Sequence, residues 1–341
     1  MNSLSTGPNA PAEMRKVTDL PEELSWMGES LPPLPDTRFV DTTRTREPLQ
    51  VIGSGAFGTV TLMSDNTVEK KSFIGNPERR NAFDAEVSAL SSLNHPNIVA
   101  FIESYESKNE YGEEYGHLVI ERALGKTVRS WLTDHKDDPV LYLRSMWYPF
   151  VQTLILAIEY IHSQGVHHLD LHPSNVMVNI TPAEKTLKVI DFGLSCNRKN
   201  SSTCGRPGHA VYYTAFVSDE KMSNYQLLEP EDMRMMDLYS VGALAYLWWF
   251  GSPPYAEIFK PASPEGAWLA WLIFGSQNRL RFPPTLEEED PVHPRAIQAM
   301  RKLLCNPRAP NAGEYSLRGK SNNLPSDLRD LALPETLWPP R

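Results

Sequence analysis

Cysteine is scarce in this chain, with three residues among 341: Cys196, Cys204 and Cys305. The count is odd, and no two of them form a Cys-x-x-Cys pair. We therefore expect neither a disulfide framework nor a zinc ribbon. The scarcity also fits a reducing compartment, in which thiols stay free.

An excess of basic charge and a long apolar run are lacking as well. The 33 lysines and arginines are outnumbered by 42 aspartates and glutamates, so nucleic acid is not expected as a partner. The N-terminus has no apolar signal core. The longest uncharged run, 238–256, contains two glycines and two prolines, which favours a buried helix ending near Gly251 over a membrane span. These features predict a cytoplasmic protein, with the nucleus as the alternative compartment.

Shifts in composition divide the chain into three parts. Residues 1–46 are rich in proline, serine and threonine and predict a flexible tail. Within it, LPPLPD at 31–36 resembles a polyproline segment, which suggests a docking partner with a proline-binding domain. Residues 316–341 contain four prolines and predict a loosely structured C-terminal tail. The length of the chain allows about two domains. We expect the folded domain over residues 47–315.

The first half of this domain has the periodicity of strands. Alternating apolar residues and glycines over 49–64 predict two strands joined by a glycine turn, and 67–73 predicts a third. Apolar residues at helical spacing predict an amphipathic helix over 77–94. Short strands are expected at 98–105 and 117–121, separated by a hairpin loop with the acidic sequence ESKNEYGEEYG.

The second half is mainly helical. From about residue 128 the predicted elements are an apolar helix at 147–163, short strands at 176–178 and 187–191, and a buried helix at 237–250. Strands followed by helices predict an α+β fold with two lobes. The expected boundaries are an N-lobe at 47–121, a hinge at 121–125 and a C-lobe at 126–315.

A glycine-rich segment occupies the first predicted turn. Gly53, Gly55 and Gly58 leave no side chains between the backbone and a ligand, so its N–H groups can face phosphate oxygens. A dinucleotide-binding glycine motif would open a helix, but here a strand-like Thr-Val-Thr-Leu sequence follows Gly58. The segment therefore favours a strand–turn–strand flap over nucleotide phosphates.

Two adjacent lysines, Lys70 and Lys71, lie on the third predicted strand. Only one can point inward, because side chains alternate along a strand. Spacing from Val68 favours Lys70, which is our preferred interpretation, whereas spacing to Phe73 favours Lys71. The inward lysine could neutralise phosphates, with Glu86 on the following helix as its carboxylate partner.

The segment HLDLHPSN at 168–175 combines groups that suit phosphoryl transfer. Asp170 can accept a proton from an attacking hydroxyl, and Asn175 can offer a carbonyl oxygen to Mg²⁺. Asp191, followed by Phe192 and Gly193, comes directly after the apolar strand LKVI and can supply a magnesium carboxylate. The order and spacing of these elements are far more specific than any one of them.

Taken together, the motifs resemble those of eukaryotic protein kinases over about residues 48–312. The resemblance extends to the phrase from Glu86 to Val99, EVSALSSLNHPNIV, and to HLVIERA at 117–123, which is similar to a gatekeeper at Ile120 and a hinge. It also includes DLYSVG, which begins at Asp237 and opens the buried helix. In this family that aspartate steadies the catalytic loop.

The resemblance implies ATP and Mg²⁺ as cofactors and proteins as substrates. It implies that Asp170 is the catalytic base and that Asn175 and Asp191 are the magnesium ligands. Lys70 or Lys71, paired with Glu86, would hold the α- and β-phosphates. The residues implied to hold the remainder of the nucleotide are Gly53, Gly55 and Gly58 over the phosphates, and Val60 with the hinge backbone of Glu121 and Ala123 around adenine.

Three departures from the family pattern stand out. Leu169 replaces the arginine that usually receives an activation-loop phosphate, which puts control by such a phosphate in doubt. His172 replaces the lysine of serine/threonine kinases and would stabilise phosphate charge less than a permanent cation. The Ala-Pro-Glu signature is blurred: Glu229-Pro-Glu231 lies too close to Asp237, and 213–217 lacks the proline and the glutamate. Arg308 is a candidate partner for that signature.

The sequence thus predicts an ATP- and magnesium-dependent protein kinase that acts on serine or threonine. This specificity rests on DLHPSN, which is nearer to the D-L-K-P-x-N of serine/threonine kinases than to the D-L-A-A-R-N of tyrosine kinases. Two alternatives remain open. The departures at Leu169 and His172 would suit a weak or inactive kinase-like scaffold. The histidine would also suit a small-molecule phosphotransferase of the aminoglycoside or choline type.

Overall fold

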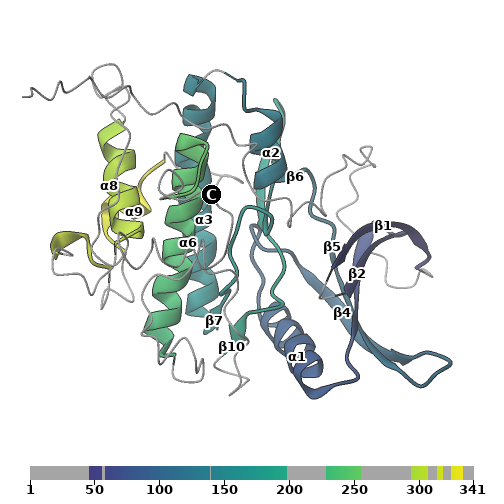
Figure 1. The fold of residues 1–341 in the computed structure, drawn as a ribbon. Helices are drawn as coiled ribbons and strands as arrows, with labels where there is room; N and C mark the ends of the chain where they lie inside the picture. The colour runs from purple at the N-terminus through teal and green to yellow at the C-terminus, as the bar shows by residue number, and fades with distance from the viewer. Residues whose placement is uncertain are drawn as a thin grey trace, which may run out of the picture.

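A computed structural model describes residues 46–55, 58–138, 140–197, 228–254, 293–305, 313–317 and 324–332. These residues form a strand-rich N-lobe and a helical C-lobe, which confirms the predicted two-lobed α+β fold (Figure 1). The N-terminal segment 1–45, including the polyproline-like motif, lies outside the described residues. Its docking partner stays a prediction.

The N-lobe is built on an antiparallel sheet with the strand order β1-β2-β3-β5-β4. A tight turn joins β2 to β3, because Asn66 adopts a φ of 65° and the Asp65 carboxylate accepts the backbone N–H of Thr67. The resulting register places Lys70 between Val60 of β2 and Leu118 of β5. The strands are β1 (Pro48–Gly55), β2 (Gly58–Met63), β3 (Thr67–Phe73), β4 (Phe101–Lys108) and β5 (Glu114–Glu121).

The hairpin between β4 and β5 has a shorter loop than the sequence predicted. The whole acidic segment 106–116 was expected to be loop, but its ends continue the two strands, to Lys108 and from Glu114. A salt bridge of 2.9 Å joins these two residues. Asn109 closes the remaining turn, since its side-chain oxygen accepts the backbone N–H groups of Tyr111 and Glu113.

Helix α1 (Pro77–Ser91) packs against strands β3, β4 and β5. It begins where Asn76 accepts the backbone N–H of Arg79 at 2.9 Å, with Pro77 in the first turn. Phe83 and Leu90 are buried against the sheet, and Glu86 lies on the same buried side. The helix therefore carries a carboxylate into the interior of the N-lobe.

The C-lobe begins after the hinge at 121–125 and contains two small sheets beside its helices. One sheet has the order β6-β8-β9, and the other pairs β10 with β7. The sheets frame the loop 168–175. The elements from the hinge to β10 are β6 (Lys126–Thr127), α2 (Val128–Asp134), α3 (Val140–Ser163), β7 (Val166–His167), β8 (Val176–Ile180), β9 (Lys185–Val189) and β10 (Cys196–Asn197).

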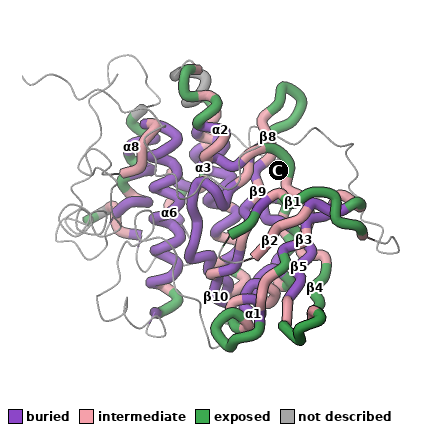
Figure 2. The backbone as a smooth tube through the Cα atoms, turned by 45° about the vertical axis from the view of Figure 1, so that its right-hand side comes forward, coloured by how far each residue is buried: buried purple, intermediate pink, exposed green. Residues whose placement is uncertain are grey.

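Helix α6 (Pro230–Phe250) is buried on all sides from Asp232 onward and packs against α3 and against α8 (His293–Leu303) (Figure 2). The prediction of a buried helix is confirmed, and the helix ends at Gly251 with a φ of 72°. It begins earlier than the predicted residue 237, so Glu229-Pro-Glu231 opens this helix. Among the described residues, no helix combines the length and apolar character that crossing a membrane requires.

The scarcity of cysteine predicted reduced thiols, and the structure differs at one position. Cys196 in β10 takes part in a disulfide bond, whereas Cys305 is buried with a free thiol. One bond is not a framework, and the core of both lobes is apolar packing.

The prediction of a loose tail from residue 316 is wrong for part of that segment. The leucines that the structure describes there are buried in the C-lobe core: Leu317, Leu324, Leu328 and Leu331. The short element η5 (Gly313–Tyr315) precedes Leu317, and Leu328 lies in α9 (Ser326–Arg329), which packs on α3. The backbone N–H of Leu331 also donates to the side chain of Gln152 in α3, at 2.6 Å. Prolines suggested a tail, but regularly placed leucines anchor the segment.

This packing gives a prediction for stability. Leu328 is fully buried, so Leu328→Ala should lower the free energy of unfolding by about 2–5 kcal/mol in a urea titration. Leu49, which is 59% exposed, offers a matched control. Leu49→Ala should change the free energy of unfolding by no more than about 0.5 kcal/mol. Equal effects of the two substitutions would contradict the packing of α9.

Candidate active site

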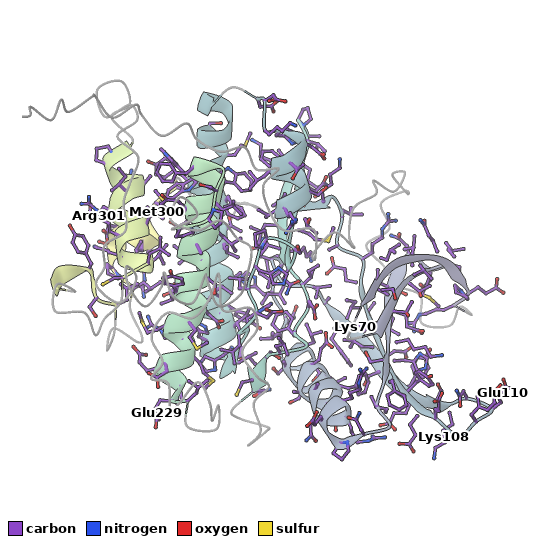
Figure 3. All side chains as sticks on the ribbon, viewed as in Figure 1. Lys70, Lys108, Glu110, Glu229, Met300 and Arg301 are labelled. Carbon is purple, nitrogen blue, oxygen red and sulfur yellow. The ribbon has the colours of Figure 1, made fainter. Side chains whose placement is uncertain are left out.

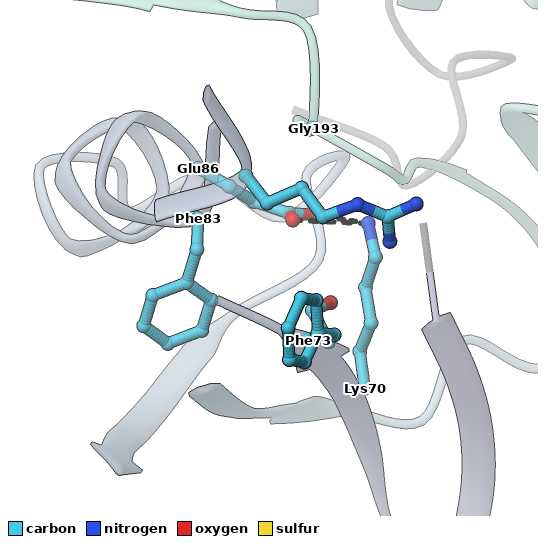
Figure 4. Close-up of a pocket in the computed structure, with 7 residues that line it drawn as sticks. Lys70, Phe73, Phe83, Glu86 and Gly193 are labelled. Carbon is cyan, nitrogen blue, oxygen red and sulfur yellow. Dashed lines mark hydrogen bonds and ion pairs between the residues drawn. The ribbon is translucent and has the colours of Figure 1, made fainter. Parts of the chain in front are cut away.

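Lys70 forms the centre of a buried charge cluster between the lobes. Its ammonium donates to both oxygens of Glu86, at 2.8 and 2.9 Å, and to Oδ1 of Asp191, at 2.9 Å. Figure 3 shows Lys70 on the sheet of the N-lobe, and Figure 4 shows its contact with Glu86. A cavity of about 200 Å³ lies beside the pair, lined by these two residues, Gly193 and the rings of Phe73 and Phe83.

The structure decides between the two adjacent lysines. Lys70 is buried, whereas Lys71 is exposed on the other face of β3, with its ammonium 4.5 Å from the ring centre of Tyr115. The preferred interpretation therefore holds, and Lys71 does not reach the carboxylates. Alternation along the strand separates the two side chains, and the sheet register determines which one faces inward.

The three charges of this cluster shift one another's pKa. Burial by itself would lower the pKa of Lys70, but attraction to Asp191 and Glu86 outweighs burial and raises it. Burial would raise the pKa of Asp191, yet the neighbouring ammonium lowers it to about 2. Burial, with repulsion from Asp191, raises the pKa of Glu86 despite its bond to Lys70. Lys70 and Asp191 are consequently both charged near neutral pH.

The turn at Asp191 has a backbone that aims its carboxylate at Lys70. Asp191 adopts a φ of 59°, an uncommon conformation for a non-glycine residue, and its Oδ1 accepts the N–H of Gly193 at 3.2 Å. A Cβ atom at Gly193 would lie 3.2 Å from this oxygen and 3.3 Å from the ammonium of Lys70. Glycine there leaves room for the charge cluster.

The glycine segment lies above this cluster on β1 and β2. Gly53 pairs with Val60, and Gly55 pairs with Gly58 across the turn. Gly58 has a φ of +128°, and a Cβ atom there would lie 2.1 Å from the carbonyl oxygen of Lys71. Only glycine fits that position. The two residues at the tip of the turn, 56 and 57, lie outside the described residues.

Asp237 of α6 anchors the loop 168–175. Its carboxylate accepts the backbone N–H groups of His168, at 2.9 Å, and Leu169, at 2.8 Å, and it pairs with His162 Nε2 at 2.8 Å. Asp237 is fully buried, and its bonds to the backbone of His168 and Leu169 lie away from water. The sequence indicated the role of Asp237 only through the family resemblance, and it did not indicate the role of His162.

Leu169 is held by apolar contacts. It has a φ of 62° and is 2% exposed. Its side chain belongs to a small hydrophobic cluster that joins the loop to β10 and to the start of α6, and whose other members are Cys196, Leu228, Met233 and Met236. The position where the sequence resemblance implied an arginine is therefore part of an apolar cluster in this chain.

Asp170 and Asn175 lie side by side in this loop. The amide nitrogen of Asn175 donates to the backbone oxygen of Asp170 at 2.9 Å and lies 3.3 Å from its Oδ2. This bonding turns the amide oxygen of Asn175 away from Asp170, where it can serve a cation. The backbone N–H of Ile190 donates to the carbonyl of Asn175 at 2.9 Å, which links the loop to the Asp191 turn.

The hinge is tied to both lobes. The backbone N–H of Glu121 donates to Ala100, and its carboxylate forms a 2.7 Å salt bridge with Lys188 of β9. Arg122 donates to the side chain of Asn66 at 2.8 Å. Ala123 is partly buried and packs against the core. The salt bridge to Lys188, which the sequence did not indicate, fixes the hinge against the C-lobe.

Part of the predicted Ala-Pro-Glu region lies outside the described residues, namely the segment 213–217 considered for the signature and its candidate partner Arg308. The signature itself is clarified in one respect, because Glu229-Pro-Glu231 is the first turn of α6. The choice of register for the signature in the segment before α6, which the sequence left open, stays open.

The fold and the site together define a protein of the two-lobed kinase class. A lysine on β3 meets a glutamate of α1 and the aspartate that follows β9, beside a loop that carries Asp170 and Asn175. The chain matches the family described as protein kinase domain over residues 46–307, which is more than half of its length. It belongs to the protein kinase family.

Curated relatives are similar at modest identity. A calcium/calmodulin-dependent protein kinase type 1 of Macrobrachium nipponense is 27% identical over 220 residues, 61% of this chain and 57% of the relative. A probable myosin light chain kinase of Dictyostelium discoideum is 27% identical, covering 60% and 62%. The serine/threonine-protein kinase SAPK4 of Oryza sativa subsp. japonica is 29% identical, covering 63% and 56%. The matches span less than two thirds of each relative.

The anchor at Asp237 gives a pH-dependent prediction. Burial would raise the pKa of Asp237, but the hydrogen bond and charge of His162 outweigh burial and lower it. The ionised carboxylate therefore stabilises the fold above the ordinary aspartate pKa of about 3.9, and this contribution is lost as pH falls through the lower folded-state pKa. At pH 7, Asp237→Asn should lower the free energy of unfolding by about 1.5–3 kcal/mol.

The measurement is the free energy of unfolding from pH 7 down to pH 3 for both proteins. The difference between them should be largest near neutral pH and should shrink below about pH 4. A difference that grows as pH falls would contradict this role of Asp237.

Proposed function

We propose that the protein is an ATP- and magnesium-dependent protein kinase that transfers the γ-phosphoryl group to serine or threonine. The contact of Lys70 with both Glu86 and Asp191 carries this proposal. It brings the phosphate-binding lysine of the N-lobe to the metal-binding aspartate of the C-lobe. Phosphoryl transfer depends mainly on such alignment and on charge stabilisation.

Each proposed role follows from a position in the site. Asp170 accepts the proton of the attacking hydroxyl, and its carboxylate is oriented by the amide of Asn175. Lys70 neutralises the α- and β-phosphates, while Glu86 keeps its ammonium in place. The backbone of Glu121 and Ala123 holds adenine, with Val60 against the base and with Gly53, Gly55 and Gly58 over the phosphates.

The oxygens of Asp191 and Asn175 suit Mg²⁺, a hard cation that prefers oxygen ligands. The pKa of Asp191 is lowered to about 2, so its carboxylate is available as an anion across the physiological range. Magnesium, when bound, neutralises charge on the phosphates during transfer. The residues present fit this group, since they offer one carboxylate and one amide oxygen on adjoining segments.

Specificity for serine or threonine rests on two supports. The loop sequence DLHPSN is nearer to the serine/threonine type, and one relative's name, the rice protein SAPK4, states that specificity. The alternatives are a kinase-like scaffold and a small-molecule phosphotransferase. The assembled charge cluster favours an active enzyme over a scaffold, because the groups that transfer needs lie in contact.

The two lysines offer a matched pair for testing the phosphate-binding role. Lys70→Met should reduce phosphate transfer from labelled Mg·ATP by about a hundredfold or more, because it removes the cation that meets the phosphates. Lys71→Met changes the neighbouring residue on the exposed face and should leave transfer close to that of wild type. Equal losses in both variants would refute the assignment of Lys70.

The base is tested with a protein substrate and a serine/threonine peptide library. Asp170→Asn should reduce transfer by about 10²–10⁴-fold, because the amide cannot accept the hydroxyl proton. Stabilisation by Mg·ATP in a thermal melt should persist in this variant. If wild-type protein is stabilised by Mg·ATP yet transfers no phosphate to any peptide, the scaffold or the small-molecule phosphotransferase becomes the better assignment.

A further inference from the structure

Each lobe contains a His-Pro turn with the same local geometry. His95-Pro96-Asn97 follows α1, and His172-Pro173-Ser174 lies in the loop beside Asp170. In both, the ring Nδ1 accepts the backbone N–H of the residue two positions later, at 3.1 Å in the first and 3.2 Å in the second. Each histidine therefore closes its own turn in the same way.

Apart from the hydrogen bond at Nδ1, the two imidazole rings have different surroundings. The ring of His95 packs on Tyr160, with a centroid distance of 4.8 Å. The ring of His172 is buried, and its Nε2 lies 3.7 Å from Oδ2 of Asp170, the oxygen that Asn175 also approaches. Only the second histidine faces the residue proposed as the base.

The hydrogen bond at Nδ1 determines which nitrogen of His172 carries a proton. A nitrogen that accepts an N–H group cannot itself be protonated, so the proton of the neutral ring lies on Nε2. That N–H faces the Asp170 carboxylate. The present separation is longer than a hydrogen bond, and such contacts in enzymes without substrate often shorten when substrate binds.

We infer that His172 is a positioning residue that orients the carboxylate of Asp170 through its Nε2–H group. This inference rests on the proposed function, because it assigns Asp170 as the base. Two donors, Asn175 from one side and His172 from the other, would hold one oxygen of the carboxylate. The aspartate is then aligned with the attacking hydroxyl, and His172 acts as a neutral donor with no need of a positive charge.

Two substitutions separate this role from closure of the turn. His172→Asn keeps a side-chain acceptor near the Nδ1 position and loses the donor toward Asp170. His172→Gln offers an amide nitrogen near the Nε2 position. His95→Asn makes the same change in the matched turn, away from the site. We expect kcat to fall about 10- to 100-fold in His172→Asn, with the KM for ATP little changed, because misalignment of a catalytic group slows the reaction more than it weakens binding.

His172→Gln should recover part of the lost kcat, and His95→Asn should retain wild-type kcat. The inference is overturned if His172→Asn keeps full kcat, or if the Gln and Asn variants lose kcat equally with thermal melting temperatures like that of wild type. A fall in kcat that His95→Asn shares would likewise assign the effect to the turn. If His172→Asn fails to fold, comparison of His172→Gln with wild type still decides the outcome.

A second readout does not depend on activity. Long-range ¹H–¹⁵N NMR spectra, with the His172 signal identified by its loss in His172→Gln, report which ring nitrogen is protonated. A neutral ring protonated at Nε2 supports the inference, and one protonated at Nδ1 overturns it. If wild-type protein transfers no phosphate while the ring is protonated at Nε2, the proposed function has failed and the geometry of His172 stands.

Discussion

The shared charge of Lys70 is the interaction on which the site depends. One ammonium lies between the buried carboxylate of Glu86 and the half-buried carboxylate of Asp191, which come from α1 and from the turn after β9. Without it the two carboxylates would be left unpaired away from water, at a large cost in free energy. The contact between α1 and the Asp191 turn, and with it this approach of the two lobes, therefore depends on the side chain of Lys70. The positive φ of Asp191 is tolerated because it delivers the carboxylate to this cation.

A second buried charge supports the loop that carries the proposed base. Asp237 has no role in the proposed chemistry. Its carboxylate accepts hydrogen bonds from two consecutive backbone N–H groups of the loop and pairs with His162. It lies on α6, which is buried on all sides and packed against α3. The apolar core thus provides a rigid base for a polar loop. Leu169 adds to this support by packing against the start of α6.

Much of the fold could be predicted from the sequence, because periodicity is a local property. The third strand was placed at 67–73, where it is found, and the buried helix ends at Gly251 as expected. Predictions failed where a local signal competed with packing. Acidic residues at 106–116 suggested a loop, but cross-strand pairing extends both strands. Prolines after residue 316 suggested a tail, but leucines such as Leu328 are buried against α3 and α8.

The sequence by itself determined the types and the order of the functional residues: the glycine segment, the lysine pair, Glu86, the loop with Asp170 and Asn175, and Asp191. These are identities, and they can be read without a structure. Only the tertiary structure decided which lysine faces inward, that His162 pairs with Asp237, that Lys188 holds the hinge, and that His172 faces Asp170 while His95 does not. The reason is physical. The contacts of Lys70, His162 and Lys188 join segments whose relative direction is set by sheet register and helix packing, and the contact of His172 depends on the conformation of its loop, and no local sequence pattern specifies either.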